Sequence, residues 1–86
     1  MLFSDPCFEE IANVDVETNY YKLEIDFVGT SENFKDCLRV CENHGSCYAA
    51  MLNDVNECEF QMSFPNSALT TSQGHNVYIN HCTVTE

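Results

Sequence analysis

The stretch that decides the fold is residues 31–60, SENFKDCLRVCENHGSCYAAMLNDVNECEF. Its first part spaces four apolar side chains as on one face of an α-helix, and these are Phe34, Cys37, Leu38 and Cys41. The charged residues of the same segment fall on the opposite face. Ser31 is a suitable N-cap and Gly45 a suitable stop, so the pattern predicts one helix over residues 32–43.

The second part of this stretch predicts a β-hairpin. Residues 47–52 and 57–62 are two short strand candidates joined by the turn-forming residues 53–56. Upstream, residues 20–28 alternate apolar with charged side chains, which predicts a half-buried strand. Downstream, the polar residues 63–76 predict a long mobile loop, and residues 77–82 predict a final strand. Weaker strand-like runs occur before residue 17.

Six cysteines in 86 residues indicate how the protein is held together. An even number of cysteines in a short chain is typical of disulfide-bonded extracellular domains. A hydrophobic content of 44%, with six Phe and four Tyr, indicates one folded domain with a modest core. Cysteines on the helix face the hairpin, but the spacing alone does not choose among the possible pairings of Cys7, Cys37, Cys41, Cys47, Cys58 and Cys82.

The order of these features resembles the PAN/apple domain superfamily. The resemblance rests on five features in order along the chain. The first two are an N-terminal cysteine, Cys7, and a helix with Cys37-x3-Cys41. The other three are a cysteine beside an aromatic residue (Cys47-Tyr48), a cysteine in the return strand (Cys58-Glu59-Phe60) and a closing Tyr-x3-Cys (Tyr78 to Cys82). It covers the chain from Cys7 to Cys82. Family members often carry a basic residue before the last cysteine, where this chain has Asn80-His81.

The resemblance implies an α+β fold, a small disulfide-rich PAN/apple-like module with one helix packed on a curled antiparallel sheet. It also implies the pairs Cys37–Cys58 and Cys41–Cys47, with the outer Cys7–Cys82 bond of apple-type members. We therefore expect a single domain over residues 1–86, with its core at about residues 7–82, excised from a larger secreted or cell-surface protein. The N-terminal MLFSDPC lacks the basic and hydrophobic regions of a signal peptide.

The net charge of −11 restricts the partners of such a module. It disfavours nucleic acids, heparin-like glycans and anionic membranes, and it favours a protein with a basic face. No stretch approaches the ~20 apolar residues of a membrane span. We expect non-catalytic extracellular recognition through protein–protein binding, in adhesion or assembly. The alternatives are lectin-like binding of a neutral carbohydrate and a structural role in a matrix or adhesive polymer.

Catalytic and metal chemistry have weaker support in the sequence. The cysteines lack the paired knuckles of a zinc site and the Cys-x-x-Cys of a redox motif, and no hydrolase motif occurs. Acidic pairs near Asp15 and Asp54 supply oxygen ligands suited to calcium, but they do not match a calcium loop. The sequence thus predicts no cofactor, no metal and no enzyme activity.

Aromatic side chains are the remaining candidates for ligand contacts, because exposed rings pack against sugars and protein hot spots. The candidate ligand-binding residues are Tyr20, Phe64, His75 and Tyr78. Phe64 and His75 flank the predicted polar loop. The alternative interpretation for each aromatic residue is packing in the core or at a sheet edge.

Overall fold

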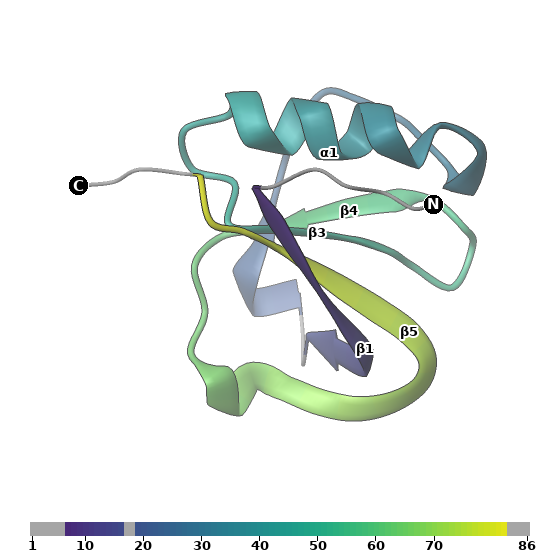
Figure 1. The fold of residues 1–86 in the computed structure, drawn as a ribbon, viewed down its shortest axis with the longest axis vertical. Helices are drawn as coiled ribbons and strands as arrows, with labels where there is room; N and C mark the ends of the chain where they lie inside the picture. Colours follow the sequence, from purple (N-terminus) through teal and green to yellow (C-terminus); the bar gives the residue numbers. More distant parts are fainter. Residues whose placement is uncertain (1–6, 17–18, 83–86) are drawn as a thin grey trace.

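The computed structural model describes residues 7–16 and 19–82, and in this part of the chain one α-helix lies across an antiparallel sheet (Figure 1). The elements are β1 (Phe8–Val16), β2 (Lys22–Leu23), α1 (Phe34–Asn43), β3 (Ala49–Leu52), β4 (Cys58–Gln61) and β5 (Leu69–Asn80). The order of strands in the sheet is β1-β5-β3-β4-β2, and every pairing is antiparallel. The predicted α+β class, with one helix on an antiparallel sheet, is confirmed.

The helix begins where the apolar spacing predicts but has a different cap. A single 3-10 turn, Ser31–Asn33, leads into α1. Thr30, rather than Ser31, accepts a hydrogen bond from the Glu32 backbone N–H at 3.2 Å, and the Thr30 N–H donates to Asn33 Oδ1 at 2.7 Å. This reciprocal arrangement is a capping box with an asparagine in the place of the usual glutamate or glutamine.

The sheet is covered on both faces. On one face, α1 packs over Ala50 and Phe60, together with Cys37, Leu38, Cys41 and Cys47. On the other face, a second buried cluster forms around Ala49, Met51, Phe64, Val77 and Ile79. Ala49 and Ala50 are both fully buried because neighbouring residues of a strand point to opposite faces.

The second cluster is enclosed because β5 bends. Figure 1 shows β5 curving below the helix, with β1 running alongside it. The pairing jumps from Ala12↔Asn76 to Val14↔Thr71, so Asn13 lies opposite the longer segment of residues 72–75 on β5. Asn13 (φ 61°) accepts a hydrogen bond through Oδ1 from the N–H of Gly74 (φ +90°) at 3.1 Å. This irregularity gives the β1–β5 ribbon its curl and places His75 at the bend.

Two predictions about strands are wrong in part. Within residues 20–28, only Lys22–Leu23 pairs with a neighbouring strand. The side chains still alternate between half-buried and exposed from residue 21 to 28, because the extended chain presents Leu23, Ile25 and Phe27 to the helix-side core. The alternation of apolar and charged residues therefore indicates which side of the segment is buried, but it does not indicate whether a partner strand exists.

The predicted loop over residues 63–76 is largely a strand. After a 3-10 turn at Asn66–Ala68, β5 begins at Leu69 and pairs with β1. The ribbon exposes most side chains of residues 70–74 to solvent, so its composition is polar although its backbone is paired. The hairpin of β3 and β4, and the final strand as far as Asn80, are confirmed.

Three disulfides join the elements, and their pairing agrees with the predicted one. Cys7–Cys82 closes the described ends, Cys37–Cys58 ties α1 to β4, and Cys41–Cys47 ties the end of α1 to the segment before β3. No free cysteine remains. Bonds of this number and kind are typical of extracellular proteins.

Asn80, two residues before the last cysteine, has a structural role. It is 2% exposed, and its side-chain amide donates to the Cys47 carbonyl at 3.1 Å and to the Cys41 carbonyl at 3.4 Å. The Asn80 Oδ1 accepts from the Cys82 N–H at 2.9 Å. The side chain thus joins both ends of the Cys41–Cys47 loop to the end of β5.

Candidate functional site

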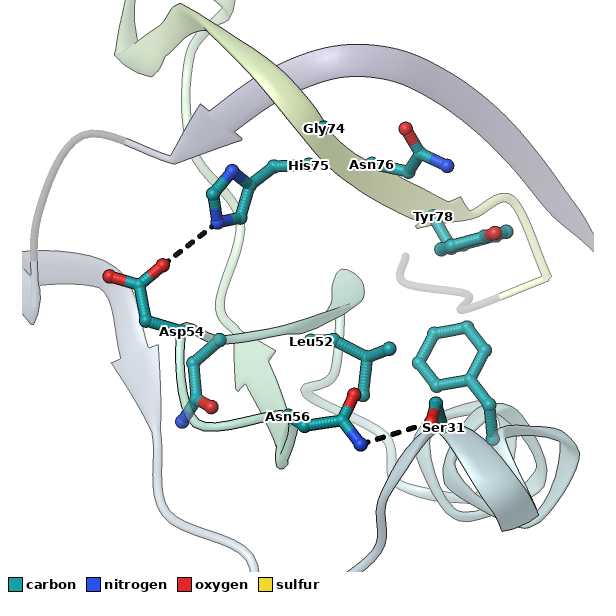
Figure 2. A pocket seen from close by; sticks show the side chains of 10 residues that line it. Ser31, Leu52, Asp54, Asn56, Gly74, His75, Asn76 and Tyr78 are labelled. Atoms are coloured by element: carbon teal, nitrogen blue, oxygen red, sulfur yellow. Dashed lines mark hydrogen bonds and ion pairs between the residues drawn. The ribbon is translucent and has the colours of Figure 1, made fainter.

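A groove of about 520 Å³ lies between the start of α1, the β3–β4 turn and the bend of β5 (Figure 2). Its size is within the range of small-ligand sites. We call it the amide groove, because three asparagines contribute to it. Its lining residues are Ser31, Phe34, Leu52, Asn53, Asp54, Asn56, Gly74, His75, Asn76 and Tyr78.

The β3–β4 turn owes its shape to Asn53. The Asn53 Oδ1 accepts hydrogen bonds from the N–H groups of Val55 at 3.0 Å and Glu57 at 2.9 Å. This side chain therefore satisfies backbone donors that the turn leaves open. Asn56 has a φ of 66° and donates through Nδ2 to Ser31 Oγ at 3.0 Å, which joins the turn to the start of the helix (Figure 2).

The opposite wall of the amide groove is aromatic. The rings of Phe34 and Tyr78 meet edge to face, with centroids 4.9 Å apart. Glu10 Oε2 accepts from Tyr78 Oη at 3.2 Å and from Asn76 Nδ2 at 2.7 Å. Burial raises the pKa of the Tyr78 phenol, the hydrogen bond with Asn76 opposes this shift, and the charge and hydrogen bond of Glu10 add to it. The phenol is therefore neutral at physiological pH and remains a hydrogen-bond donor.

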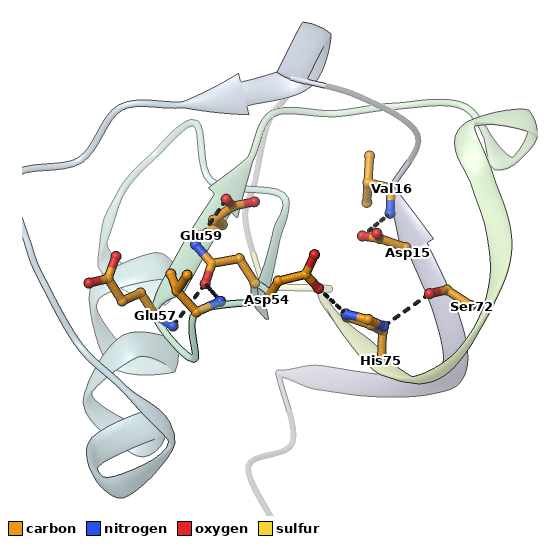
Figure 3. A network of polar contacts seen from close by, with 9 residues as sticks. Asp15, Val16, Asp54, Glu57, Glu59, Ser72 and His75 are labelled. Atoms are coloured by element: carbon orange, nitrogen blue, oxygen red, sulfur yellow. Dashed lines mark hydrogen bonds and ion pairs between the residues drawn. The ribbon is translucent and has the colours of Figure 1, made fainter.

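His75 joins the bend of β5 to the hairpin turn. Its Nε2 lies 2.9 Å from Asp54 Oδ1, and its Nδ1 lies 2.9 Å from Ser72 Oγ (Figure 3). These are the residue types of a hydrolytic triad, but Ser72 contacts a histidine of its own strand and the Asp54 side chain is 90% exposed. Water competes for such a carboxylate, whereas a triad uses a buried one to orient the imidazole. The arrangement acts here as a tie between two elements.

A second hollow of about 170 Å³ lies beyond this tie, and we call it the acidic cavity. Asn53, Asp54 and His75 line both hollows. The carboxylates of Asp15 on β1 and Glu59 on β4 also line this cavity (Figure 3). The other lining residues are Val16, Met51 and Gln61.

The candidate residues from the sequence are divided between different places. His75 and Tyr78 both line the amide groove. Tyr20 is 77% exposed and contacts Tyr21 edge to face, outside the groove. Phe64 is 7% exposed and packs between Tyr21 and Tyr48 in the core, which agrees with the alternative interpretation of the aromatic residues as core packing.

The sequence does not indicate how several of the site residues meet. Asn53 and Asn56 belong to the predicted turn, and a turn with two asparagines also concentrates amides at one place. Asp15 and Glu59 are 44 positions apart in the chain, and no local pattern relates them. Asn76 belongs to the predicted loop, and its place opposite Ala12 follows only from the pairing of β5 with β1.

No family model matches the chain, and neither a curated protein nor a solved structure does. No helix among the described residues is long and apolar enough to cross a membrane. Within residues 7–16 and 19–82, no group of three or more histidine, cysteine or acidic side chains is arranged to hold a metal ion.

Proposed function

We propose that this protein is a non-catalytic extracellular recognition module of the PAN/apple type, which binds a protein with a basic face. The extracellular setting is supported by the three disulfides. The PAN/apple assignment is supported by the order of the cysteines and by the helix laid across an antiparallel sheet.

The observation that carries the proposal is how little of the acidic charge is compensated within the molecule. Among the described carboxylates, only Asp36 is paired with a lysine or arginine, through a 2.8 Å contact with Arg39. The pairs of Asp54 with His75 and of Glu9 with His81 involve a full charge only when the histidine is protonated. A strongly negative surface raises the association rate of a positively charged partner and repels anionic ones.

A screen against an array of extracellular proteins tests the proposal with the oxidised protein as the probe. We expect the binders to have basic surfaces. We also expect their affinity to fall by about tenfold or more when NaCl is raised from about 50 mM to about 500 mM, because salt screens exposed charges. Binders that are acidic or neutral, with affinities insensitive to salt, would contradict the proposal.

A second candidate function, the binding of a neutral carbohydrate, is favoured by the amide groove. Tyr78 and Phe34 offer ring surface, and Asn56 and Asn76 offer amides for hydroxyl groups. Binding to a neutral glycan array that persists at about 500 mM NaCl would support this candidate, since uncharged contacts are not screened. Loss of that binding in an Asn56→Ala variant would locate it in the groove.

A further inference from the structure

We propose that the acidic cavity is the receptor for a single basic side chain, a lysine or an arginine, of the partner protein. The inference rests on the proposed function and specifies its contact point. The cavity is lined by three carboxylates, two apolar side chains and the buried amide of Gln61, together with Asn53 and His75. The carboxylates, the Gln61 amide and the apolar side chains each match one part of a long cationic side chain.

In each carboxylate, one oxygen accepts a hydrogen bond that holds the side chain in place, and the other oxygen is available to a ligand. Asp15 Oδ1 accepts from the Val16 N–H at 2.8 Å, and Glu59 Oε2 accepts from Asn53 Nδ2 at 3.1 Å. Asp54 Oδ1 is held by His75 at 2.9 Å (Figure 3). The second oxygen of each carboxylate has no donor among the described residues. An ammonium or guanidinium group supplies several donors to such oxygens at once.

The second and independent feature is Gln61, which also lines the cavity. Gln61 is 3% exposed, and its Oε1 has no hydrogen-bond partner among the described residues. Its Nε2 makes only a long contact, 3.8 Å, with Met51 Sδ. A buried amide oxygen without a donor is unfavourable. A donor group that reaches this oxygen can satisfy it, whereas an anion or an apolar group cannot.

The apolar part of the lining suits the stem of the incoming side chain. Val16 and Met51 are 8% and 3% exposed, and they face the same hollow as the carboxylates. Lysine and arginine pack their methylene stems on such surfaces and direct the charged end to polar groups. No lysine or arginine is among the lining residues. Lys22 lies opposite Gln61 in the β2–β4 register but is exposed and forms no ion pair with a described residue.

The test is an NMR titration of the oxidised, isotope-labelled protein with the peptide acetyl-Gly-Gly-Lys-Gly-Gly-amide. We expect saturable shifts in the Gln61 side-chain amide and in the backbone amides of Asp15, Asp54 and Glu59. The arginine peptide should act similarly. A peptide with norleucine in place of lysine keeps the stem, lacks the charge and should cause no such shifts.

A matched pair of variants separates the cavity from the general negative charge. Glu59→Gln and Glu57→Gln change the net charge equally, but Glu59 lines the cavity and Glu57 is an exposed residue outside it. We expect Glu59→Gln to lower the affinity for the lysine peptide by about fivefold, and Glu57→Gln to lower it by less than about twofold. If Glu59→Gln melts well below the unmodified protein, Asp15→Asn replaces it in the same comparison.

Three results would overturn the inference. The first is equal weakening by the two glutamine variants, and the second is equal binding of the norleucine peptide. The third is a set of larger, saturable shifts of the same residues with calcium chloride at the peptide's concentration. If the two glutamine variants weaken binding equally, the proposed function still stands, because the attraction between the acidic protein and its basic partner is then spread over the surface. If the lysine peptide maps to the cavity but the array yields no basic partner, the cavity is supported and the proposed function fails.

Discussion

Asparagine side chains take the place of backbone partners at three bends of this protein. Asn13 Oδ1 accepts from the Gly74 N–H across the β1–β5 ribbon, Asn33 Oδ1 accepts from the Thr30 N–H before the helix, and Asn53 Oδ1 accepts two N–H groups in the hairpin turn. A short amide side chain can do this because its oxygen stays close to the backbone, where it reaches N–H groups of the same segment or of an adjacent one. Asn13 and Asn56 also adopt positive φ, which asparagine tolerates better than most residues.

Of the three glycines, Gly29 has the least room for an added Cβ. A Cβ at this position would lie 2.6 Å from Cys37 Sγ and 2.8 Å from Phe27 Cε2. Cys37 is fully buried and bonded to Cys58, so its sulfur cannot move aside easily. We expect Gly29→Ala to lower the free energy of unfolding by about 1–3 kcal/mol, measured by chemical denaturation of the oxidised protein.

Gly45→Ala is the control for this substitution. A Cβ at Gly45 has nothing within 4 Å, and the residue is exposed after the end of α1. We expect the free energy of unfolding to change by no more than about 0.5 kcal/mol in this variant. Equal losses in the two variants would mean that the contacts around Gly29 are not responsible for the effect.

At the element scale, the start of the helix depends on a cap that is one residue earlier than the apolar spacing suggests. Thr30→Ala removes the acceptor of the Glu32 N–H and should lower the free energy of unfolding by about 0.5–2 kcal/mol. Ser31→Ala removes only the exposed contact with Asn56 and should change it by no more than about 0.5 kcal/mol. Thermal melts of the two variants measure the difference, and a larger loss in Ser31→Ala would assign the cap to Ser31.

The β1–β5 ribbon is the element that shapes both hollows. Its bend carries Gly74, His75 and Asn76 to the amide groove, and the end of β1 carries Asp15 to the acidic cavity. The tie between His75 and Asp54 then fixes the distance between the ribbon and the hairpin turn. The two hollows are therefore consequences of one irregular pairing.

At the scale of the whole molecule, the disulfides provide a large share of the stability. The chain-entropy relation gives about 4.5, 3.3 and 2.2 kcal/mol for bonds that separate 75, 21 and 6 residues along the chain. Together this is about 10 kcal/mol, which is comparable to the net stability of an ordinary domain. We expect dithiothreitol to abolish the cooperative melt followed by circular dichroism.

Alkylation without reductant is the control for this experiment, because a protein with all six thiols bonded should keep its intact mass. An unchanged melt in dithiothreitol would show that the two hydrophobic clusters suffice without the crosslinks. Labelling of the native protein would show that some of the thiols are free.

Local patterns in the sequence predicted the parts of this protein that depend on neighbours along the chain. The spacing of Phe34, Cys37, Leu38 and Cys41 predicted the helix, and two short strand candidates around an asparagine-containing turn predicted the hairpin. The cysteine order, through the resemblance to PAN/apple domains, also predicted all three pairs. These features succeed because helical periodicity and tight turns are set within a few residues.

The start of β5, the position of Phe64 and the pairing of polar groups depend on tertiary contacts. His75 meets Asp54 across 21 residues, and Asp15 shares a cavity with Glu59 across 44 residues. Such meetings depend on the register of the β1–β5 pairing and on the residues 72–75 that it leaves unpaired with β1. Strand register is set by contacts between segments that are distant in the chain, so no local pattern of residues records it.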